Sequence, residues 1–197
     1  MANFYIMKCM AAGGPLQFIL ETNWPFQGSW KRGRMFSPDN DRRYQPPAAV
    51  IPLATEIDSK AAERIYPELT WHPLPLMSRR LVAALQEAGV NNLQTYPTTI
   101  TNPQRDTPAD YYLAVNVVGL VAAADFAESE TDPESDERVL SVDFHSLTID
   151  PQKARDALMF RLAENISAVL VHERVREHVE AKGITTLTWF EPEEWAG

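Results

Sequence analysis

Seven carboxylates lie between positions 125 and 137, and no basic residue interrupts them. Closely spaced carboxylates can bind a hard cation, but this stretch contains Pro133 and has no glycine at the sharp turn that a calcium-binding loop needs. Charges of one sign keep such a stretch solvated, and they complement a basic protein surface. We therefore predict no metal but a surface for a basic partner, formed by Glu128, Glu130, Asp132, Glu134, Asp136 and Glu137. The simpler alternative is a solvated loop without a partner.

A second set of residues has the side-chain types of a hydrolase or transferase site. Asp143 and His145 lie at alternate positions at the end of a stretch, Val139 to Phe144, in which apolar and polar residues alternate. Residues two apart on a strand share a face, so Asp143 can orient His145 as a general base, with Cys9 as the nucleophile. The alternative is an exposed Asp/His pair and a cysteine that fills apolar space.

Other catalytic and metal-binding patterns are missing from the sequence. It has no phosphate-binding glycine loop, no paired metal-ligating cysteines, no helical His-x-x-x-His and no nucleophile-elbow serine. His172 and His178 are separated by about 240° around a helix, so they cannot hold one metal ion together. We therefore expect a protein that is not an enzyme and that needs no cofactor.

Two stretches that begin ninety-four positions apart predict the same order of elements. The first, 78–96, reads SRRLVAALQEAGVNNLQTY, and the second, 172–190, reads HERVREHVEAKGITTLTWF. Both place apolar residues at helical spacing, then a glycine, then a pattern typical of a strand. Ser78 can cap the first helix, while Gly89 and Gly183 can adopt the left-handed conformation that ends a helix. We predict two helix-glycine-strand units.

Short apolar runs predict the remaining strands. Alanine, glycine and proline at 11–15 separate the runs Phe4 to Met10 and Leu16 to Leu20, which favours an N-terminal hairpin. Ser59 to Tyr66 is expected to form a short helix before Pro67. The other runs are Val50 to Leu53, Tyr111 to Val118, Val139 to Phe144, Leu158 to Leu162 and Ile166 to Val171. The expected class is α+β with a mainly antiparallel sheet.

Two polar features within these predicted elements need explanation. Asn116 interrupts an apolar run typical of a strand buried on both faces, and a buried amide needs partners, so we expect it to hold a neighbouring loop. The segment from Thr22 to Pro52 has no regular periodicity. It combines aromatic residues with the basic set Lys31, Arg32, Arg34, Arg42 and Arg43. Either its aromatic side chains pin it to the protein or the segment binds a partner.

Length and composition are those of one globular domain. The 197 residues are 45% hydrophobic, and we treat 1–197 as a single domain, with a β-rich and irregular part up to position 75 and the remainder from 76 to 197. Without a secretory signal or an apolar run of membrane length, and with a single cysteine, the chain is expected in the cytoplasm. Its net charge of −9 disfavours direct contact with nucleic acid or anionic lipid. The oligomeric state stays open.

The order of these segments resembles that of the polymorphic-toxin immunity proteins, immunity family eleven. The stretch LMSRRLVAALQEAGVNNLQTYP is similar to the family's serine-capped helix, glycine and strand, and DYYLAVNVVGLVAAADFAES to its tyrosine-rich strand. LMFRLAENISAVLVHERVREHVEAKGI resembles the family's Phe-Arg-Leu strand, apolar strand and last helix. The final TTLTWFEP departs from the family, which usually has another glycine before the aromatic residue. The resemblance extends from about Pro75 to Pro192.

This resemblance implies a function but no catalytic residues. The family members are encoded beside secreted antibacterial toxins, such as effectors of type VI secretion, and bind and block them. A cytoplasmic antitoxin of an effector-immunity pair would follow, with the cognate toxin as its partner. We prefer a nuclease toxin, because enzymes that grip phosphates present basic grooves that an acidic protein can fill. The alternative from another class is the small hydrolase or transferase that uses Asp143 and His145.

Overall fold

The computed structural model describes residues 3–9, 16–20, 26–57, 66–103, 107–132 and 141–195. Its helices are α1 (Arg79–Glu87), α2 (Pro151–Ala154) and α3 (Glu173–Ala181), and its short 3-10 helices are η1 (Gln27–Lys31), η2 (Arg42–Tyr44) and η3 (Pro192–Glu194). The strands are β1 (Phe4–Cys9), β2 (Leu16–Leu20), β3 (Ile51–Ile57), β4 (Leu69–Thr70), β5 (Leu76–Ser78), β6 (Leu93–Ile100), β7 (Tyr112–Val117), β8 (Leu120–Val121), β9 (Glu130–Thr131), β10 (Phe144–Ser146), β11 (Met159–Leu162), β12 (Val169–His172) and β13 (Leu187–Phe190). The helix predicted from Ser59 lies outside the described residues, apart from Tyr66 at its end.

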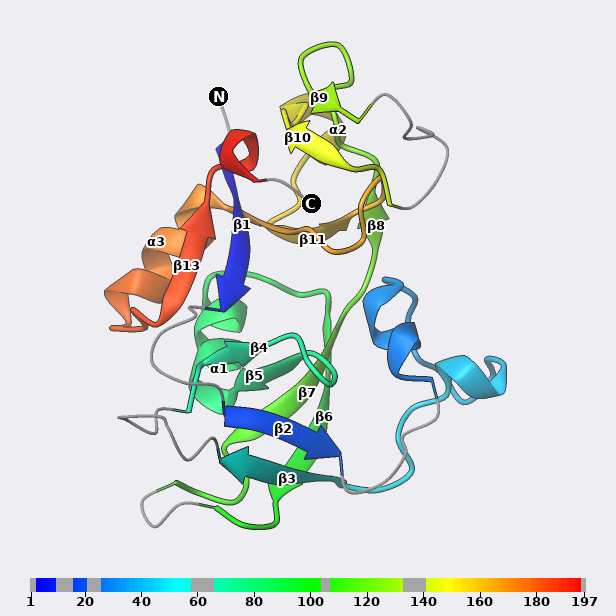
Figure 1. The fold of residues 1–197 in the computed structure, drawn as a ribbon, viewed down its shortest axis with the longest axis vertical. Coiled ribbons are helices and arrows are strands. Elements are labelled where there is room, and N and C mark those ends of the chain that lie inside the picture. Colours follow the sequence, from blue (N-terminus) through cyan, green and yellow to red (C-terminus); the bar gives the residue numbers. More distant parts are fainter. Residues whose placement is uncertain are drawn as a thin grey trace.

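The strands form two large sheets and one small hairpin (Figure 1). One large sheet has the order β13-β1-β12-β11-β8, and the other has the order β2-β3-β6-β7-β5-β4. Most neighbouring strands are antiparallel, while β3 with β6 and β8 with β11 are parallel. β9 and β10 pair only with each other. The predicted α+β class with a mainly antiparallel sheet is confirmed.

Both predicted helix-glycine-strand units are present. The Ser78 hydroxyl accepts a hydrogen bond from the Leu81 amide at 3.0 Å at the start of α1, and Nδ1 of His172 accepts one from the Arg174 amide at 3.1 Å at the start of α3. The first four amides of a helix lack partners within it, so each cap satisfies one of them. Gly89 ends α1 with φ 100° and leads into β6, as Gly183 with φ 73° leads from α3 towards β13.

The two units also share one strand arrangement. β5 and β6 flank β7 and pair antiparallel with it, and β12 and β13 flank β1 in the same way. Ser78 lies opposite Tyr112, and its counterpart His172 lies opposite Phe4. At the other flank Leu93 lies opposite Val117, as Leu187 does opposite Cys9. Tyr112 precedes Val117 by as many residues as Phe4 precedes Cys9, so both units pair in the same register.

This arrangement explains why the predicted N-terminal hairpin is wrong. β1 does not pair with β2; it is the middle strand of the second unit, and β2 pairs with β3 in the other sheet. The flanking strands of each unit are parallel to each other and need an antiparallel strand between them. In the first unit that strand follows in sequence as β7, whereas in the second it comes from the N-terminus.

The two units face each other across a shared core. α1 packs against α3, and the inner faces of both sheets contribute to the same cluster of buried side chains, among them Met7, Leu85, Val115, Val171 and Val179. The opposite face of the five-stranded sheet is covered by Ala123 and Ala124, by residues between Val142 and Ala154, and by Trp195. The segment that contains Trp30 and Phe36 covers the opposite face of the six-stranded sheet.

The aromatic residues of this covering segment pin it only in part. Trp30 is 0% exposed and makes edge contacts with Phe36 and Tyr96, whereas Phe26 is 37% exposed. Trp24 lies outside the described residues. The Asn116 side-chain amide donates to the Arg34 carbonyl at 2.8 Å. The prediction that this buried amide holds a neighbouring loop is therefore confirmed.

Candidate partner-binding surface

The described half of the predicted acidic surface lies on the β9–β10 hairpin. Glu130 is on β9 and pairs with Ser146 of β10, Glu128 lies two residues before β9, and Asp132 follows it directly. Glu128 and Glu130 are exposed, and Asp132 is half-buried. The remaining predicted residues, Glu134, Asp136 and Glu137, lie outside the described part of the chain.

Backbone hydrogen bonds hold this hairpin to the protein. The Asp125 amide donates to the Thr148 carbonyl at 2.9 Å, and the Asp125 carbonyl accepts from Ser129 at 2.8 Å. The Ser129 hydroxyl in turn accepts a hydrogen bond from the Thr148 amide at 2.9 Å. Beneath the hairpin, the rings of Phe126 and Phe144 stack with their centroids 6.1 Å apart. The exposed carboxylates of Glu128 and Glu130 therefore lie on a part of the chain that is hydrogen-bonded to the rest of the protein.

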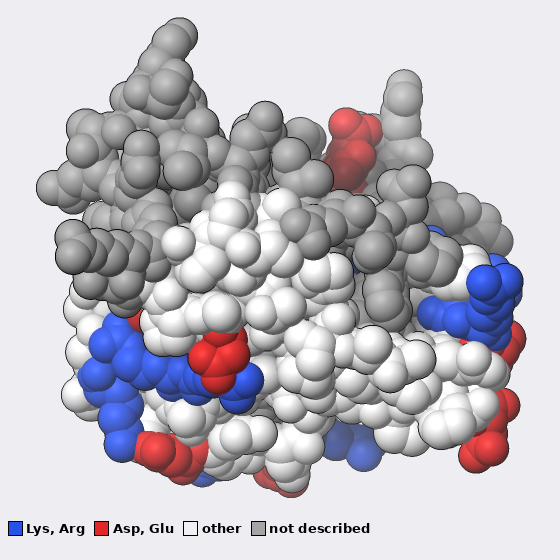
Figure 2. Space-filling model, turned by 90° about the horizontal axis from the view of Figure 1, so that it is seen from below, with Lys and Arg blue, Asp and Glu red and all other residues white. Residues whose placement is uncertain are grey.

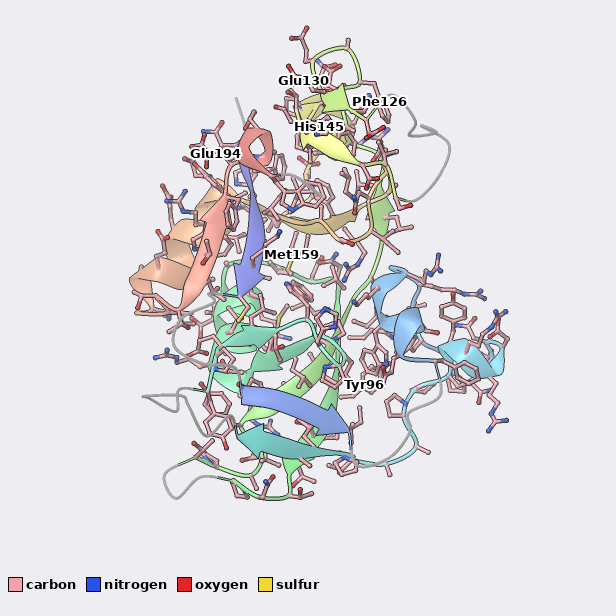
Figure 3. The ribbon with its side chains drawn as sticks, in the orientation of Figure 1. Tyr96, Phe126, Glu130, His145, Met159 and Glu194 are labelled. Carbon is pink, nitrogen blue, oxygen red and sulfur yellow. The ribbon has the colours of Figure 1, made fainter. Side chains whose placement is uncertain are left out.

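A second acidic group lies beside the first and was not assigned to the site from the sequence. The C-terminal 3-10 helix η3 packs against β10, and the Leu147 amide donates to the Pro192 carbonyl. This contact brings Glu191, Glu193 and Glu194, all exposed, to the same end of the molecule as Glu130 (Figure 3). The acidic composition of the last residues was the available signal, but their distance of about sixty residues from Glu130 hid the proximity.

Two interactions fix the position of η3. Trp195 is 3% exposed and packs against Phe144, with the ring centroids 6.5 Å apart. The ammonium group of Lys8 lies 5.5 Å from the centre of the Phe190 ring and 5.7 Å from that of Trp195. A cation is attracted to the face of an aromatic ring. The acidic residues of η3 are thus held on a packed aromatic support.

The surface contains a hollow of about 350 Å³ between η3, the start of β1 and the chain after β10. Glu191 and Glu193 line it from one side, Tyr5 from β1, and Thr148 and Ile149 from the remaining side. A hollow with carboxylates at its rim and apolar atoms in its wall suits the aliphatic stem and charged end of a lysine or arginine.

The predicted Asp143–His145 pair has a different setting. Both side chains are exposed and Phe144 between them is buried, as expected for residues that share a face. Only His145 lies on β10, however, and Asp143 precedes it: within the described residues the strand predicted from Val139 to Phe144 begins at Phe144 and extends to Ser146 instead. Cys9 belongs to another sheet, at the end of β1 that Figure 1 shows remote from β10. Burial also raises the pKa of the Cys9 thiol, which disfavours the nucleophilic thiolate. The described residues therefore do not assemble Asp143, His145 and Cys9 into one site.

Metal-binding and membrane-spanning features were also sought in the part of the chain that the structure describes. No group of three or more histidine, cysteine, aspartate or glutamate side chains is placed there to hold a metal ion. None of the helices in the same residues is long and apolar enough to cross a membrane.

The described residues thus combine a two-sheet α+β fold with an exposed acidic surface on packed aromatic rings. Comparison with protein families identifies the class of protein: the model of the immunity protein family Imm11 matches residues 52–193 of the 197. The chain therefore belongs to the Imm11 family of immunity proteins, and its expected partner is a cognate toxin. Among curated proteins, none matches the chain.

Proposed function

We propose that this immunity protein binds its cognate secreted antibacterial toxin through the acidic surface and occludes the toxin's active or substrate-binding site. The observation that carries the proposal is the convergence of two acidic groups, one at β9 and one on η3, at one end of the molecule. The sequence separates them widely, and only the packing of η3 on β10 brings them together.

The negative charge of this surface favours a partner with a basic surface. Exposed carboxylates attract a basic surface over a distance of about one Debye length, roughly 8 Å at physiological salt, and they raise the rate of association. The hollow beside Glu191 and Glu193 then receives a lysine or arginine side chain as an anchor. Buried anchors of this kind determine how long a complex lasts.

A toxin that cleaves nucleic acid fits these requirements. An enzyme that grips phosphates presents a basic groove, and an acidic protein that fills the groove competes directly with the substrate. On this account the immunity protein acts in the cytoplasm of the producing cell and its kin, where an incoming nuclease would meet its substrate. Delivery of the toxin by type VI secretion belongs to the same proposal.

Association kinetics test the placement of the contact. The variant Glu128→Lys/Glu130→Lys/Glu193→Lys reverses three exposed charges, and Glu177→Lys on the exposed face of α3 is the matched control. Against the purified toxin, encoded by a neighbouring gene, we expect the triple variant to associate roughly tenfold or more slowly and to lose most of its salt dependence. An association rate equal to that of the control would overturn the placement.

A further inference from the structure

A second charged surface, opposite in sign to the first, lies on the segment 26–45. This segment contains two aspartates and the five basic residues Lys31, Arg32, Arg34, Arg42 and Arg43, in a chain whose net charge is −9. In Figure 2 basic side chains stand out at the right margin, on the side where Figure 1 shows this segment. The proposed toxin contact at the acidic surface makes no use of it.

The segment is held firmly at a few points. Besides buried Trp30 and the Asn116 amide, the Gln94 side chain accepts from the Phe36 amide at 2.7 Å and donates to the Phe36 carbonyl at 2.9 Å. Gly33 has φ 65°, and a Cβ atom there would lie 2.7 Å from the Leu120 side chain. The contacts that fix the backbone are thus made by Trp30, Gly33 and Phe36, while most of the basic side chains point to solvent.

Three of the five basic side chains, those of Arg32, Arg34 and Arg43, line a hollow of about 510 Å³ together with Phe26 and Tyr44. The Arg34 guanidinium lies 4.5 Å from the centre of the Tyr44 ring. One carboxylate, that of Asp41, lies 3.8 Å from Arg34 and 3.5 Å from Arg43. Guanidinium groups match the geometry of carboxylates, and Asp41 makes only these longer-range ion pairs with the two arginines, so their guanidinium groups can still bind a further carboxylate.

Exposed apolar side chains also lie on or against this segment. Among the described residues four large hydrophobic side chains are exposed, and three of them are found here: Phe26 at 37%, Met35 at 56% and Leu120 at 38%. Phe26 lines the hollow itself. Phe26 also has φ 80° and ψ 33°, a left-handed conformation that bulky residues rarely adopt. Backbone strain of this kind is concentrated at functional sites. Aromatic, methionine and arginine side chains are also enriched in protein interfaces.

We propose that the hollow of segment 26–45 is a second contact surface for the toxin, which takes a carboxylate-bearing and partly apolar segment of that protein. The proposal rests on the proposed function for the identity of the partner. Exposed Phe26 and Met35 favour a protein over a nucleic acid, and the net charge of −9 repels a polyanion at long range.

A continuous stretch of the chain joins the two surfaces. The Gly119 amide donates to the Gly33 carbonyl at 2.6 Å, so segment 26–45 touches the chain at the start of β8. From β8 the chain runs directly through Asp125 to β9 and the acidic surface. Contacts of opposite sign at two places fix the orientation of a complex, and they exclude toxins that carry the wrong charge at either place.

The test compares the two surfaces in binding to the purified toxin. The basic-hollow variant is Arg32→Glu/Arg43→Glu, with Arg174→Glu on α3 as its control, and the acidic variant is Glu130→Lys/Glu193→Lys, with Glu177→Lys as its control. Arg34 is left unchanged because it packs on Tyr44. We expect both variants to raise the dissociation constant about tenfold or more, and both controls to leave it unchanged.

The outcomes separate the two proposals. If the acidic variant binds the toxin more weakly and the basic-hollow variant binds it as tightly as the wild type, only the inference about the hollow is overturned. If only the basic-hollow variant binds more weakly, the acidic placement is overturned and the hollow is supported as a contact. If neither variant binds more weakly, both are overturned. If the basic residues instead bind a single-stranded 20-nucleotide DNA while toxin affinity is unaffected by their reversal, the hollow is a nucleic-acid site and the inference is wrong.

A further variant distinguishes a binding role from a structural one. Phe26→Gly removes a strained, exposed ring, so we expect it to raise the melting temperature while it weakens toxin binding at least threefold. A variant that binds as tightly as the wild type would show that Phe26 is not part of the contact.

Discussion

The two helix-glycine-strand units share their internal structure and differ in what covers them. Each has a capped helix, a glycine at positive φ, two outer strands and an antiparallel middle strand in the same register. The outer face of one sheet carries the basic segment with Trp30, and that of the other carries the acidic chain from Ala123 onwards together with η3. The shared parts build the core, and the parts that differ carry the charges available to a partner.

The shared core predicts that both units unfold together. Leu85 of α1 and Val179 of α3 occupy equivalent positions, and both are 0% exposed in one cluster. We expect Leu85→Ala to lower the free energy of unfolding by about 2–5 kcal/mol, and Val179→Ala by somewhat less because it removes fewer atoms. Urea denaturation should show one transition with an unchanged slope in each variant. Two separate transitions, each affected by one substitution, would show that the units are independent.

The capping residues Ser78 and His172 occupy equivalent positions, but their removal should lower the free energy of unfolding by different amounts. The Ser78 hydroxyl also hydrogen-bonds the carboxylate of Glu68, which is 4% exposed and 2.5 Å from Arg80. Ser78→Ala therefore removes a cap and one partner of a buried charge, for about 2–3 kcal/mol. His172→Ala removes a cap and the edge contact of the imidazole with the Phe4 ring, whose centroids are 5.4 Å apart, for about 1–2 kcal/mol. Equal losses in chemical denaturation would show that Glu68 does not depend on Ser78.

The smallest expected effect concerns the ion pair between Glu87 at the end of α1 and Lys182 just after α3. Each unit contributes a different kind of residue to it. The hydrogen bond and charge of Lys182, at 2.5 Å, lower the pKa of Glu87, with a lesser contribution from His178. A lowered carboxyl pKa stabilises the folded state above the unfolded pKa of about 4.3, and that stability is lost as pH falls through the folded pKa.

Thermal unfolding between about pH 3 and 7 measures this contribution. Glu87→Gln should melt below the wild type at neutral pH, and the difference should disappear in acid. Glu177→Gln, on the exposed face of α3, should show no such pH dependence. A difference that persists unchanged at pH 3 would exclude Glu87 as its source.

The units themselves could be predicted from the sequence because their signals are local. Ser78, the helical spacing after it and Gly89 each determine structure within a few residues, and the strand predicted after Gly89 is present as β6. Asn116 was predicted to hold a loop because a buried amide needs partners.

The pairing of distant segments could not be predicted in the same way. A short turn-like stretch after β1 favours a hairpin, but β1 instead pairs with β12 on one side and β13 on the other. No local sequence pattern indicates that β12 and β13 need a strand from elsewhere between them. Likewise, η3 and β9 are both acidic in sequence, but only the packing of Trp195 on Phe144 brings them together. Both faces of β11 are covered, so Arg161 is only 2% exposed. The sequence of β11 alone does not indicate that this charged residue is buried.

Neutralisation of a toxin by binding is best tested by co-purifying this protein with the products of its neighbouring genes and then measuring the growth of cells that express any bound partner. We expect one neighbouring product to bind, to kill cells when it is expressed alone, and to be harmless beside the wild-type protein. The Glu128→Lys/Glu130→Lys/Glu193→Lys variant should protect less well than Glu177→Lys. If no neighbouring product binds or kills, or if protection occurs without binding, this protein does not act by binding a toxin.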